Sequence, residues 1–367
     1  MTNEKTYRFI FAGGGTGGHL YPAIAVAQQL LEQKPDAEIL FVGTKTKIEA
    51  NVVPALGFKF RTIWISGFSR QLTLRNLLFP VKLITALLQS LKIMISFKPT
   101  VVIGTGSYIA GPVVWAASVL GAKIILLEQN SYPGITNRLL EKKAEEIHLS
   151  FEESKKYFRQ EAKLKLTGNP IRINLVKKDK DVSKKQFGFD NEKKTLFITG
   201  GSLGAKSINE SIAKNIERVK DYNLQVIWQT GKLYFDKYKH FESDSIKVLS
   251  FVDDMSAAYS AADLVVARAG ATTIAEVSFL GVPVLFIPSP NVAANHQYKN
   301  AMALKDIEAG EVINDTEIES NLLNKIESMI NDEDLLKKFS MNIKSISKPD
   351  AAKVIAERAI MLAERRL

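Results

Sequence analysis

Four short stretches of this 367-residue chain have the composition of ligand-binding loops. Residues 13–18, 104–112 and 200–205 are glycine clusters, and residues 268–276 combine small residues with hydroxyls. Each lies between a β-rich run and a helical pattern, so its backbone N–H groups can approach a phosphate that the positive end of the helix dipole also attracts. One such loop can be a simple tight turn. Three glycine loops at the carboxyl ends of predicted strands favour a polyphosphorylated ligand.

Two titratable residues at these loops are candidates for chemistry. His19 follows the first glycine cluster, and because imidazole titrates near neutral pH it is the best candidate for a general base, with Glu128 as the runner-up. Alternatively, His19 donates to a phosphate or caps a backbone group. Glu276 lies one helical turn beyond Thr272, where its carboxylate can accept both hydroxyls of a ribose or only complement the helix dipole.

The sequence predicts neither a bound metal nor a cofactor. It contains no cysteine, which also excludes a disulfide framework, and its four histidines lack the spacing of metal ligands. No Asp-x-Asp follows a predicted strand, and Asp253-Asp254 is more typical of a helix cap. Helix N-termini and arginine can stabilise a leaving diphosphate without a metal.

The arrangement of β-rich runs and helical stretches indicates an α/β fold with parallel sheets covered by helices. The composition, 46% hydrophobic and 24% charged, excludes disordered and collagen-like classes. The predicted strands fall into two groups, residues 7–12, 38–42, 100–103 and 123–127, and residues 195–199, 224–229, 264–267 and 282–287.

Two domains are expected, since a domain has roughly 150 residues. A turn signal at residues 168–170, followed by a lysine-rich stretch, places their boundary near residue 170. Residues 1–170 are predicted to form one Rossmann-like domain and residues 171–349 a second. The final helix, residues 350–367, is long enough to pack back on the first domain.

The positive charge of the chain is concentrated in its first half. Residues 1–170 contain 21 basic and 12 acidic residues, and residues 50–127 contain no acidic residue. A surface built from that segment attracts polyanions or anionic lipid.

An apolar stripe within this basic half has the period of one helix face. From Leu77 it continues at alternating steps of four and three through Val81, Ile84, Leu88, Leu91 and Ile95. One interpretation is a helix packed on its own sheet. The other is membrane docking through residues 67–82, where Phe68, Leu72, Leu74, Leu78 and Phe79 are interleaved with Arg70 and Arg75.

Eight segments, taken in order between about residues 7 and 310, resemble the MurG family of bacterial glycosyltransferases. They are GGGTGGHLYPAIAVA, GTGSYIAGP, LEQNSYPGITN, GNPIR, GGSLGAKSIN, FVDDM, RAGATTIAE and NHQY. The resemblance implies the GT-B architecture, in which two Rossmann-like domains have parallel sheets that face a cleft.

The resemblance also implies the reaction and its setting. The family is an inverting transferase that moves N-acetylglucosamine from UDP-N-acetylglucosamine to the undecaprenyl-pyrophosphoryl-N-acetylmuramyl-pentapeptide (lipid I), giving lipid II for peptidoglycan synthesis, cell shape and division. By resemblance, the N-terminal domain binds the acceptor and the membrane, and the C-terminal domain binds the UDP-sugar. The expected location is peripheral, at the cytoplasmic face of the inner membrane, with an anionic membrane surface and no nucleic acid as partner.

The site residues implied by the resemblance are spread over both predicted domains. Implied donor contacts are Thr16, Gly17, Gly18, Asn130 and Arg172 around the sugar nucleotide, Ser202 at its phosphates, the backbone of Val252 at the uracil, Ala271, Thr272, Thr273 and Glu276 at phosphate and ribose, and Gln297 at the sugar hydroxyls. Tyr108, Glu128, Asn137, Asn209 and Arg268 match further family positions whose roles stay open. Leu127 and His296 depart from the family pattern, so no role is carried over to them.

Two other function classes remain open from the sequence. A sugar-nucleotide epimerase of the same two-domain fold would share the donor but need no lipid, and the basic amphipathic segment counts against it. A nicotinamide-dependent oxidoreductase would need an acidic residue at a strand end about 20 positions after the first loop. Asp36 and Glu38 do not fit that position cleanly, which counts against this class.

Overall fold

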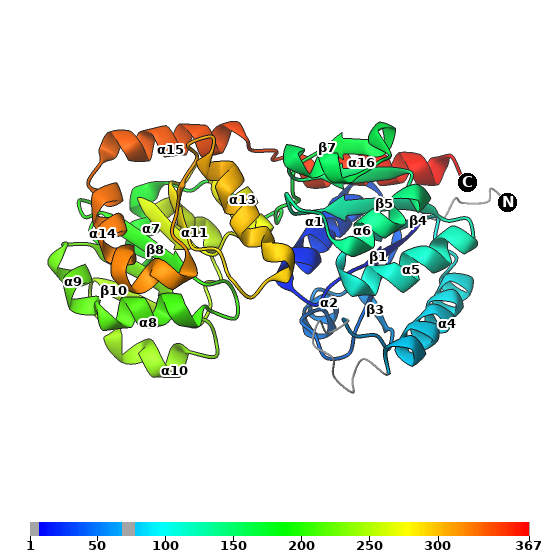
Figure 1. Ribbon diagram of the computed structural model, residues 1–367, viewed down its shortest axis with the longest axis horizontal. Helices are drawn as coiled ribbons and strands as arrows, with labels where there is room; N and C mark the ends of the chain where they lie inside the picture. The colour runs from blue at the N-terminus through cyan, green and yellow to red at the C-terminus, as the bar shows by residue number, and fades with distance from the viewer. Residues whose placement is uncertain (1–6, 68–77, 367) are drawn as a thin grey trace. The chain divides into compact units, whose positions relative to one another are not determined.

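The protein is described here from a computed structural model that covers residues 7–67 and 78–366 (Figure 1). The chain divides into two compact units. Unit 1 consists of the chain up to Ile173 together with the chain from Lys348 onward, and unit 2 consists of Asn174–Ser347. Unit 2 is therefore inserted between two parts of unit 1.

Unit 1 contains, among its described residues, a seven-stranded parallel sheet in the order β3-β2-β1-β4-β5-β6-β7. Its strands are β1 (Arg8–Ala12), β2 (Glu38–Gly43), β3 (Lys59–Thr62), β4 (Val101–Gly104), β5 (Lys123–Glu128), β6 (Glu146–Leu149) and β7 (Leu164–Leu166). Its α-helices are α1 (Gly17–Gln33), α2 (Glu49–Ala55), α4 (Phe79–Phe97), α5 (Ser107–Val119), α6 (Ile135–Leu140) and α16 (Ala351–Glu364).

Apolar residues on both sides of the central strands explain why this sheet is covered on both faces. Successive side chains of β1 point to opposite faces. Phe9 and Phe11 pack with α1 and α16, whereas Ile10 packs with α4 and α5. Each face therefore has its own hydrophobic core.

Helix α16 joins unit 1 although it lies at the end of the sequence (Figure 1). Ile355 and Ala359 are fully buried in the core shared with α1. Arg358 forms an ion pair with Glu146 on β6, and Nε2 of the buried His148 lies 3.2 Å from the same carboxylate. Although burial opposes it, hydrogen bonds from His148 and Arg358 lower the pKa of Glu146 to about 2.

Unit 2 contains, within the described chain, a six-stranded parallel sheet in the order β10-β9-β8-β11-β12-β13. Its strands are β8 (Thr195–Thr199), β9 (Gln225–Gln229), β10 (Ile246–Leu249), β11 (Leu264–Ala267), β12 (Val284–Phe286) and β13 (Glu311–Val312). Its α-helices are α7 (Lys180–Gln186), α8 (Lys206–Lys214), α9 (Ile216–Asp221), α10 (Phe235–Tyr238), α11 (Met255–Ala261), α12 (Ala271–Leu280), α13 (His296–Lys305), α14 (Ile318–Ile330) and α15 (Glu333–Ser345).

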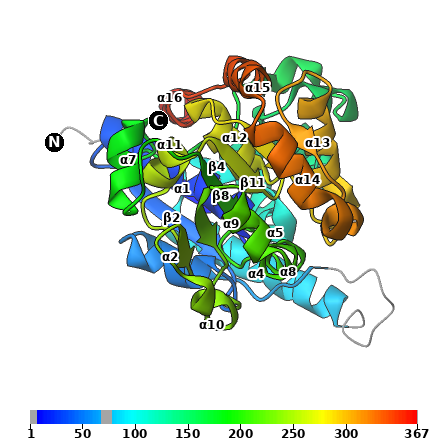
Figure 2. The same cartoon turned by 90° about the vertical axis from the view of Figure 1, so that its left-hand side faces the viewer.

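Helices cover both faces of this second sheet as well. Helices α8 and α14 lie side by side on one face, where Ile208 and Leu322 are completely buried (Figures 1 and 2). On the other face the ring of Tyr259 from α11 packs edge-on against Phe197 of β8, with centroids 5.4 Å apart. The strand order changes direction at β8, which has β9 on one side and β11 on the other, and ligands of α/β sheets bind outside the carboxyl ends of strands at such a point.

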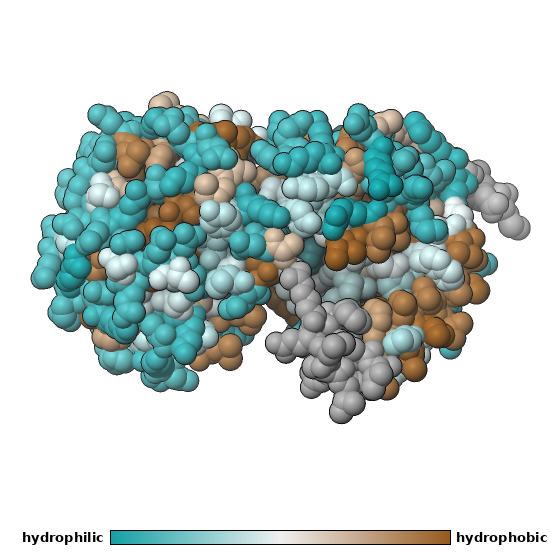
Figure 3. Space-filling view, viewed as in Figure 1, coloured by the Kyte–Doolittle hydropathy of each residue, from teal (hydrophilic) through white to brown (hydrophobic). Residues whose placement is uncertain are grey.

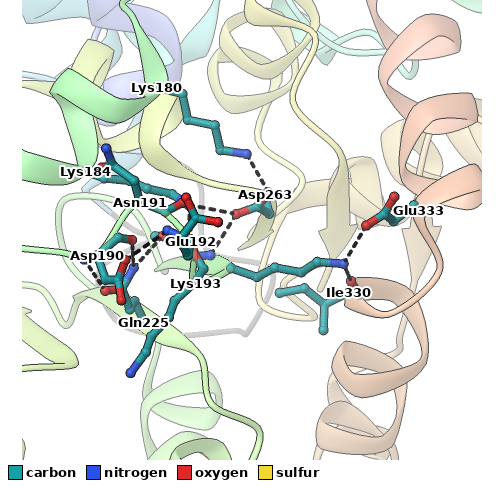
Figure 4. A network of polar contacts seen from close by, with 12 residues as sticks. Lys180, Lys184, Asp190, Asn191, Glu192, Lys193, Gln225, Asp263, Ile330 and Glu333 are labelled. Carbon is teal, nitrogen blue, oxygen red and sulfur yellow. Dashed lines mark hydrogen bonds and ion pairs between the residues drawn. The ribbon is translucent and has the colours of Figure 1, made fainter.

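A polar network fastens α7 to the amino ends of the unit 2 strands (Figure 4). The buried Lys184 amine donates to the carbonyl oxygens of Asn191 (2.9 Å) and Lys193 (2.6 Å). Asp263 accepts the backbone N–H of Thr195 at the start of β8 (2.8 Å). Burial lowers the pKa of the Lys184 amine, with the charge of Asp263 opposing that shift. The network lies at the amino ends of the strands, whereas the glycine loops lie at the carboxyl ends. It therefore supports the fold rather than a ligand site.

The α/β fold class with two parallel sheets is confirmed. Each predicted strand overlaps an observed one, and the glycine clusters follow β1, β4 and β8 as expected. The sequence did not predict five strands of the described chain, β3, β6, β7, β10 and β13.

Candidate functional site

The first glycine loop is held from behind by a carboxylate that sequence reasoning missed. Glu49, only 1% exposed, accepts the backbone N–H of Gly15 on Oε2 (2.9 Å). Its Oε1 accepts the backbone N–H (3.0 Å) and the hydroxyl (2.8 Å) of Thr44. A Cβ on Gly14 would lie 2.7 Å from the Glu49 carboxyl carbon, so this contact needs glycine. The Gly15 N–H therefore donates to a side chain of the protein rather than to a ligand phosphate.

His19 lies in the first turn of α1, against the loops that follow β4 and β5. Its Nδ1 lies 2.7 Å from the carbonyl oxygen of Thr105 and 3.1 Å from Oε1 of Gln129. A Cβ on Gly106, whose φ is +87°, would lie 3.0 Å from the His19 ring. The second glycine cluster thus allows close approach to the imidazole.

The carboxylate of Glu128 is surrounded by donors. Its oxygens accept the backbone N–H groups of Asn130 (3.0 Å) and Gly134 (3.0 Å) and the side-chain amide of Asn137 (2.9 Å). Burial raises the pKa of Glu128, and these hydrogen bonds act in the opposite direction. Through these hydrogen bonds the Glu128 carboxylate holds residues 130–137 in place.

Other predicted residues of unit 1 gather near the same strand ends. Thr16 precedes α1, and Gly17 and Gly18 begin it. The ring of Tyr108 lies under 4 Å from where a Gly15 Cβ would be, and burial, followed by the charge of Glu49, raises the pKa of Tyr108. The Arg172 guanidinium lies over the ring of Tyr21 on α1, 5.5 Å from its centroid.

In unit 2, the residue predicted to bind the ribose, Glu276, has a buried hydrogen-bond partner. Glu276 is 3% exposed, and its Oε2 accepts the hydroxyl of Tyr259 (3.0 Å). Ala271, Thr272 and Thr273 form the first turn of α12, where backbone N–H groups and the helix dipole favour an anion. Tyr259 was not predicted, because it lies on a different helix, 17 residues from Glu276 in sequence.

Two residues that match family positions of open role, Asn209 and Arg268, make internal contacts in unit 2. Asn209 is buried, accepts from Trp228 Nε1 (3.0 Å) and donates to the Thr230 carbonyl (2.8 Å). The Arg268 guanidinium binds Asp315, the Ser207 hydroxyl and the Ile287 carbonyl, so it ties β11 to α8 and to the chain after β13.

Three further predicted contacts lie in unit 2, two on loops and one at the start of α13. Ser202 is half-buried in the loop after β8. The backbone N–H of Val252 donates to Gln229 Oε1 (2.9 Å). Gln297 accepts the backbone N–H of Ser289 (2.9 Å), which leaves its amide N–H₂ as its donor group. Within the part of the chain that the structure describes, no three His, Cys, Asp or Glu side chains gather as metal ligands would.

Most of the predicted apolar stripe faces solvent on α4, whereas its member Leu91 packs against the core and Leu77 lies outside the described residues. We call the described residues Leu78, Val81, Ile84, Leu88 and Ile95 the α4 face; they are between 50% and 63% exposed. Figure 3 shows apolar residues gathered over α4. The opposite side of the helix, with Ala86 and Met94, packs into the core. The predicted docking segment itself, residues 67–82, falls largely at residues 68–77, outside the described residues.

Two basic residues accompany the α4 face. Lys92 is exposed between Leu88 and Ile95, and the Lys82 amine lies 5.8 Å from the ring centroid of Trp64, which is half exposed. Among the described residues, Phe79–Phe97 is the one helix long and apolar enough to cross a membrane by length and composition.

Comparison with known proteins identifies similar sequences over almost the whole chain. The family models for the glycosyltransferase family 28 N-terminal and C-terminal domains match residues 9–149 and 195–357. A relative from Flavobacterium psychrophilum is 45% identical, covering 98% of this chain and 99% of its own. One from Cytophaga hutchinsonii is 42% identical, covering 98% and 97%. Both are named UDP-N-acetylglucosamine--N-acetylmuramyl-(pentapeptide) pyrophosphoryl-undecaprenol N-acetylglucosamine transferase.

Solved structures show the same architecture. MurG of Acinetobacter baumannii is 27% identical, with a TM-score of 0.75 over 97% of this chain and 99% of that one. A UDP-N-acetylglucosamine 2-epimerase is 15% identical with a TM-score of 0.63, covering 99% and 98%, and at that identity it shares the fold alone.

Proposed function

Since this chain belongs to the MurG family, within glycosyltransferase family 28, we propose that it transfers N-acetylglucosamine from UDP-N-acetylglucosamine to lipid I and so makes lipid II for peptidoglycan synthesis. The chain is a glycosyltransferase by this membership. The specific reaction is supported by the similarity of this chain, along nearly its entire length, to relatives whose name states that transfer.

Unit 2 binds the donor in this proposal. The first turn of α12 holds the diphosphate with backbone N–H groups, and the buried Glu276 accepts the ribose hydroxyls. The backbone of Val252 meets the uracil, Ser202 lies by the phosphates, and Gln297 donates to the sugar hydroxyls. Positive potential at the α12 N-terminus would stabilise the departing UDP without a metal.

Unit 1 binds the acceptor in this proposal and supplies the base. The acceptor hydroxyl oxygen forms a bond to the anomeric carbon, and the bond from that carbon to UDP breaks with its electron pair leaving on UDP. The hydroxyl proton passes to His19, whose ring stands at the carboxyl ends of β1, β4 and β5. Tyr108, kept protonated by its raised pKa, is a neutral hydrogen-bond donor beside the glycine loop.

The α4 face docks the protein on a membrane in this proposal. Burying exposed Leu, Ile and Val side chains at a lipid surface is favourable, and each nearby Lys adds about 1 kcal/mol at an anionic surface. The helix keeps one side in the protein core, so it lies on the surface rather than crossing the bilayer. The chain would act at the cytoplasmic face of the inner membrane, where its lipid-linked acceptor is held.

The deciding experiment is UDP release by the purified chain with UDP-N-acetylglucosamine, with and without purified lipid I. We expect UDP release only with lipid I, in equal amount to the lipid II formed. Conversion of UDP-N-acetylglucosamine to its C2 epimer, independent of lipid and without release of UDP, would replace the proposal with the epimerase activity. NADH turnover would instead support the oxidoreductase.

A further inference from the structure

Gln129, a buried residue with no role in the reaction described so far, contacts the imidazole that accepts the proton. It is 2% exposed and directly follows β5. Its Oε1 lies 3.1 Å from Nδ1 of His19, and the carbonyl oxygen of Thr105, directly after β4, lies 2.7 Å from the same nitrogen. Since β4 and β5 are paired neighbours in the sheet, both oxygens stand on rigid strand ends.

These two contacts decide where the neutral His19 ring carries its hydrogen. A backbone carbonyl oxygen can only accept, so Nδ1 must be the protonated nitrogen and Nε2 must carry the lone pair. The orientation of the Gln129 amide follows from the same reasoning, because only its oxygen can face a donating Nδ1–H. The ring is thus held in the form that accepts a proton at Nε2.

The nitrogen of the Gln129 side-chain amide also indicates that the amide oxygen faces His19 for a reason. Its Nε2 is buried and has no hydrogen-bond partner among the described residues. Leaving a buried donor unpaired costs about 1–3 kcal/mol, which an apolar side chain of similar size would avoid. A residue that only filled space here would gain by losing its amide, so the oxygen facing His19 is the part with a use.

We propose that Gln129 is a positioning residue that, with the Thr105 carbonyl, fixes the tautomer and orientation of His19. The proposal rests on the proposed function, because it assigns the base of that transfer. When the O–H bond of the acceptor breaks and the Nε2–H bond forms, the ring becomes cationic with its Nδ1–H between two oxygen acceptors. Those acceptors stabilise the cation, as the partner of a catalytic histidine does in other enzymes.

The tautomer can be measured without substrate. In protein labelled with ¹⁵N-histidine, the four rings are distinguished by comparison with His19→Gln, whose spectrum lacks one set of signals. At a pH where His19 is neutral, we expect its Nδ1 to show the chemical shift of a protonated nitrogen and its Nε2 that of an unprotonated one. The reverse pattern would overturn the proposal whether or not the chain makes lipid II.

The role of Gln129 is tested by Gln129→Met and Gln129→Glu. We expect Gln129→Met to lower kcat roughly ten-fold while KM for both substrates stays within about two-fold, because only the orientation of the base is lost. Gln129→Glu restores an oxygen acceptor and should recover most of that kcat. Normal kcat in Gln129→Met, or no recovery in Gln129→Glu when both are folded, would contradict the proposal.

Gln225 provides the matched control. It is an equally buried glutamine in unit 2, where its amide bonds Asp190 and Thr195. Gln225→Met should lower the melting temperature and leave kcat at a permissive temperature unchanged. A cooperative thermal unfolding transition that includes unit 1 shows that each variant is folded. Absence of transfer by the wild-type chain would refute the proposed function, and the tautomer measurement would still stand.

Discussion

The carboxylate of Glu49 joins Gly15 of the first glycine loop to the end of β2 by accepting three hydrogen bonds, one from Gly15 and two from Thr44. The three partner groups, two backbone N–H groups and one hydroxyl, all donate, so each needs an acceptor oxygen. The shape of the loop beside His19 and Tyr108 therefore depends on a group 34 residues away in sequence.

Glu49→Gln should distort this loop selectively. A glutamine offers one oxygen, which can satisfy the two Thr44 donors, and its N–H₂ then opposes the Gly15 N–H. Losing that bond with a buried donor left unpaired costs about 1–3 kcal/mol, so we expect kcat/KM for the lipid acceptor to fall roughly five- to a hundred-fold. Calorimetry should show unchanged UDP affinity. Glu32→Gln, on the exposed side of α1, is the control, and equal activity of the two variants would refute the assignment.

Two variants should separate the contributions of the ribose and of the N-acetylglucosamine group to the binding affinity for the donor. Glu276→Ala removes a charged acceptor and should weaken UDP and UDP-N-acetylglucosamine alike by roughly 2–4 kcal/mol. Gln297→Ala should weaken the sugar nucleotide and leave UDP affinity unchanged. Tyr259→Phe removes the hydroxyl that donates to the Glu276 carboxylate and should weaken UDP binding by about 1 kcal/mol. The control is Tyr222→Phe at the surface of unit 2, which should leave UDP binding unchanged. Normal UDP binding by Glu276→Ala would remove this assignment.

Asn209 is expected to act on stability rather than on binding. Asn209→Leu leaves the Trp228 N–H and the Thr230 carbonyl unpaired in the core of unit 2, at a cost of about 2–4 kcal/mol. Thermal unfolding should show a lower melting temperature, with UDP affinity of the folded protein maintained. A stable variant that had lost UDP binding would instead make Asn209 a ligand contact.

The ion pair between Glu146 and Arg358 should make the attachment of α16 sensitive to acid. The pKa of Glu146 is about 2, below its ordinary value of 4.5, so the stabilisation is complete above pH 4.5 and is lost as the pH falls toward 2. Comparing wild type with Arg358→Met in urea should give a difference of about 2 kcal/mol near neutral pH that shrinks over that range. The exposed pair of Lys214 and Glu319 is the control, and Lys214→Met should have far less effect. A difference that did not change with pH would contradict this account.

The α4 face should determine membrane binding. Ile84→Ser with Leu88→Ser removes two exposed apolar side chains from its centre, and co-sedimentation with anionic vesicles should fall roughly ten-fold or more. Activity on a short, water-soluble acceptor should survive. The control is Leu233→Ser with Met341→Ser, which changes two equally exposed apolar residues of unit 2. Equal co-sedimentation of the two double variants would remove the α4 face from the membrane contact.

The sequence predicted the central strands well because they are buried on both faces and therefore form continuous apolar runs in the sequence. It did not predict β3 (KFRT), β6 (EIHL) or β13 (EV), where charged residues interrupt the apolar pattern and tertiary pairing determines the strand. The stripe of α4 was predicted to be one helix face, but its period cannot tell whether that face lies in the core or in solvent.

The sequence could not predict the contacts that organise the site, because the residues involved are far apart along the chain. His19 and Gln129 are 110 residues apart, and Tyr259 and Glu276 come from separate helices. Glycine loops indicate where backbone approaches a ligand, whereas the side chains that support those loops are placed only by the order of the strands. Gln129 did lie within the motif LEQNSYPGITN, yet nothing in that motif indicates that it faces an imidazole.

The return of α16 to unit 1 has a consequence for how the protein is made. During translation the chain emerges from its N-terminus, so α1 and the first strands leave the ribosome long before residue 348 is added. Unit 2 is contiguous and can complete its own core while it is being synthesised. Unit 1 cannot, because Ile355 and Ala359 cover α1 only after α16 has been synthesised. Unit 1 therefore completes its core after unit 2, and the apolar surface of α1 stays uncovered until α16 has emerged.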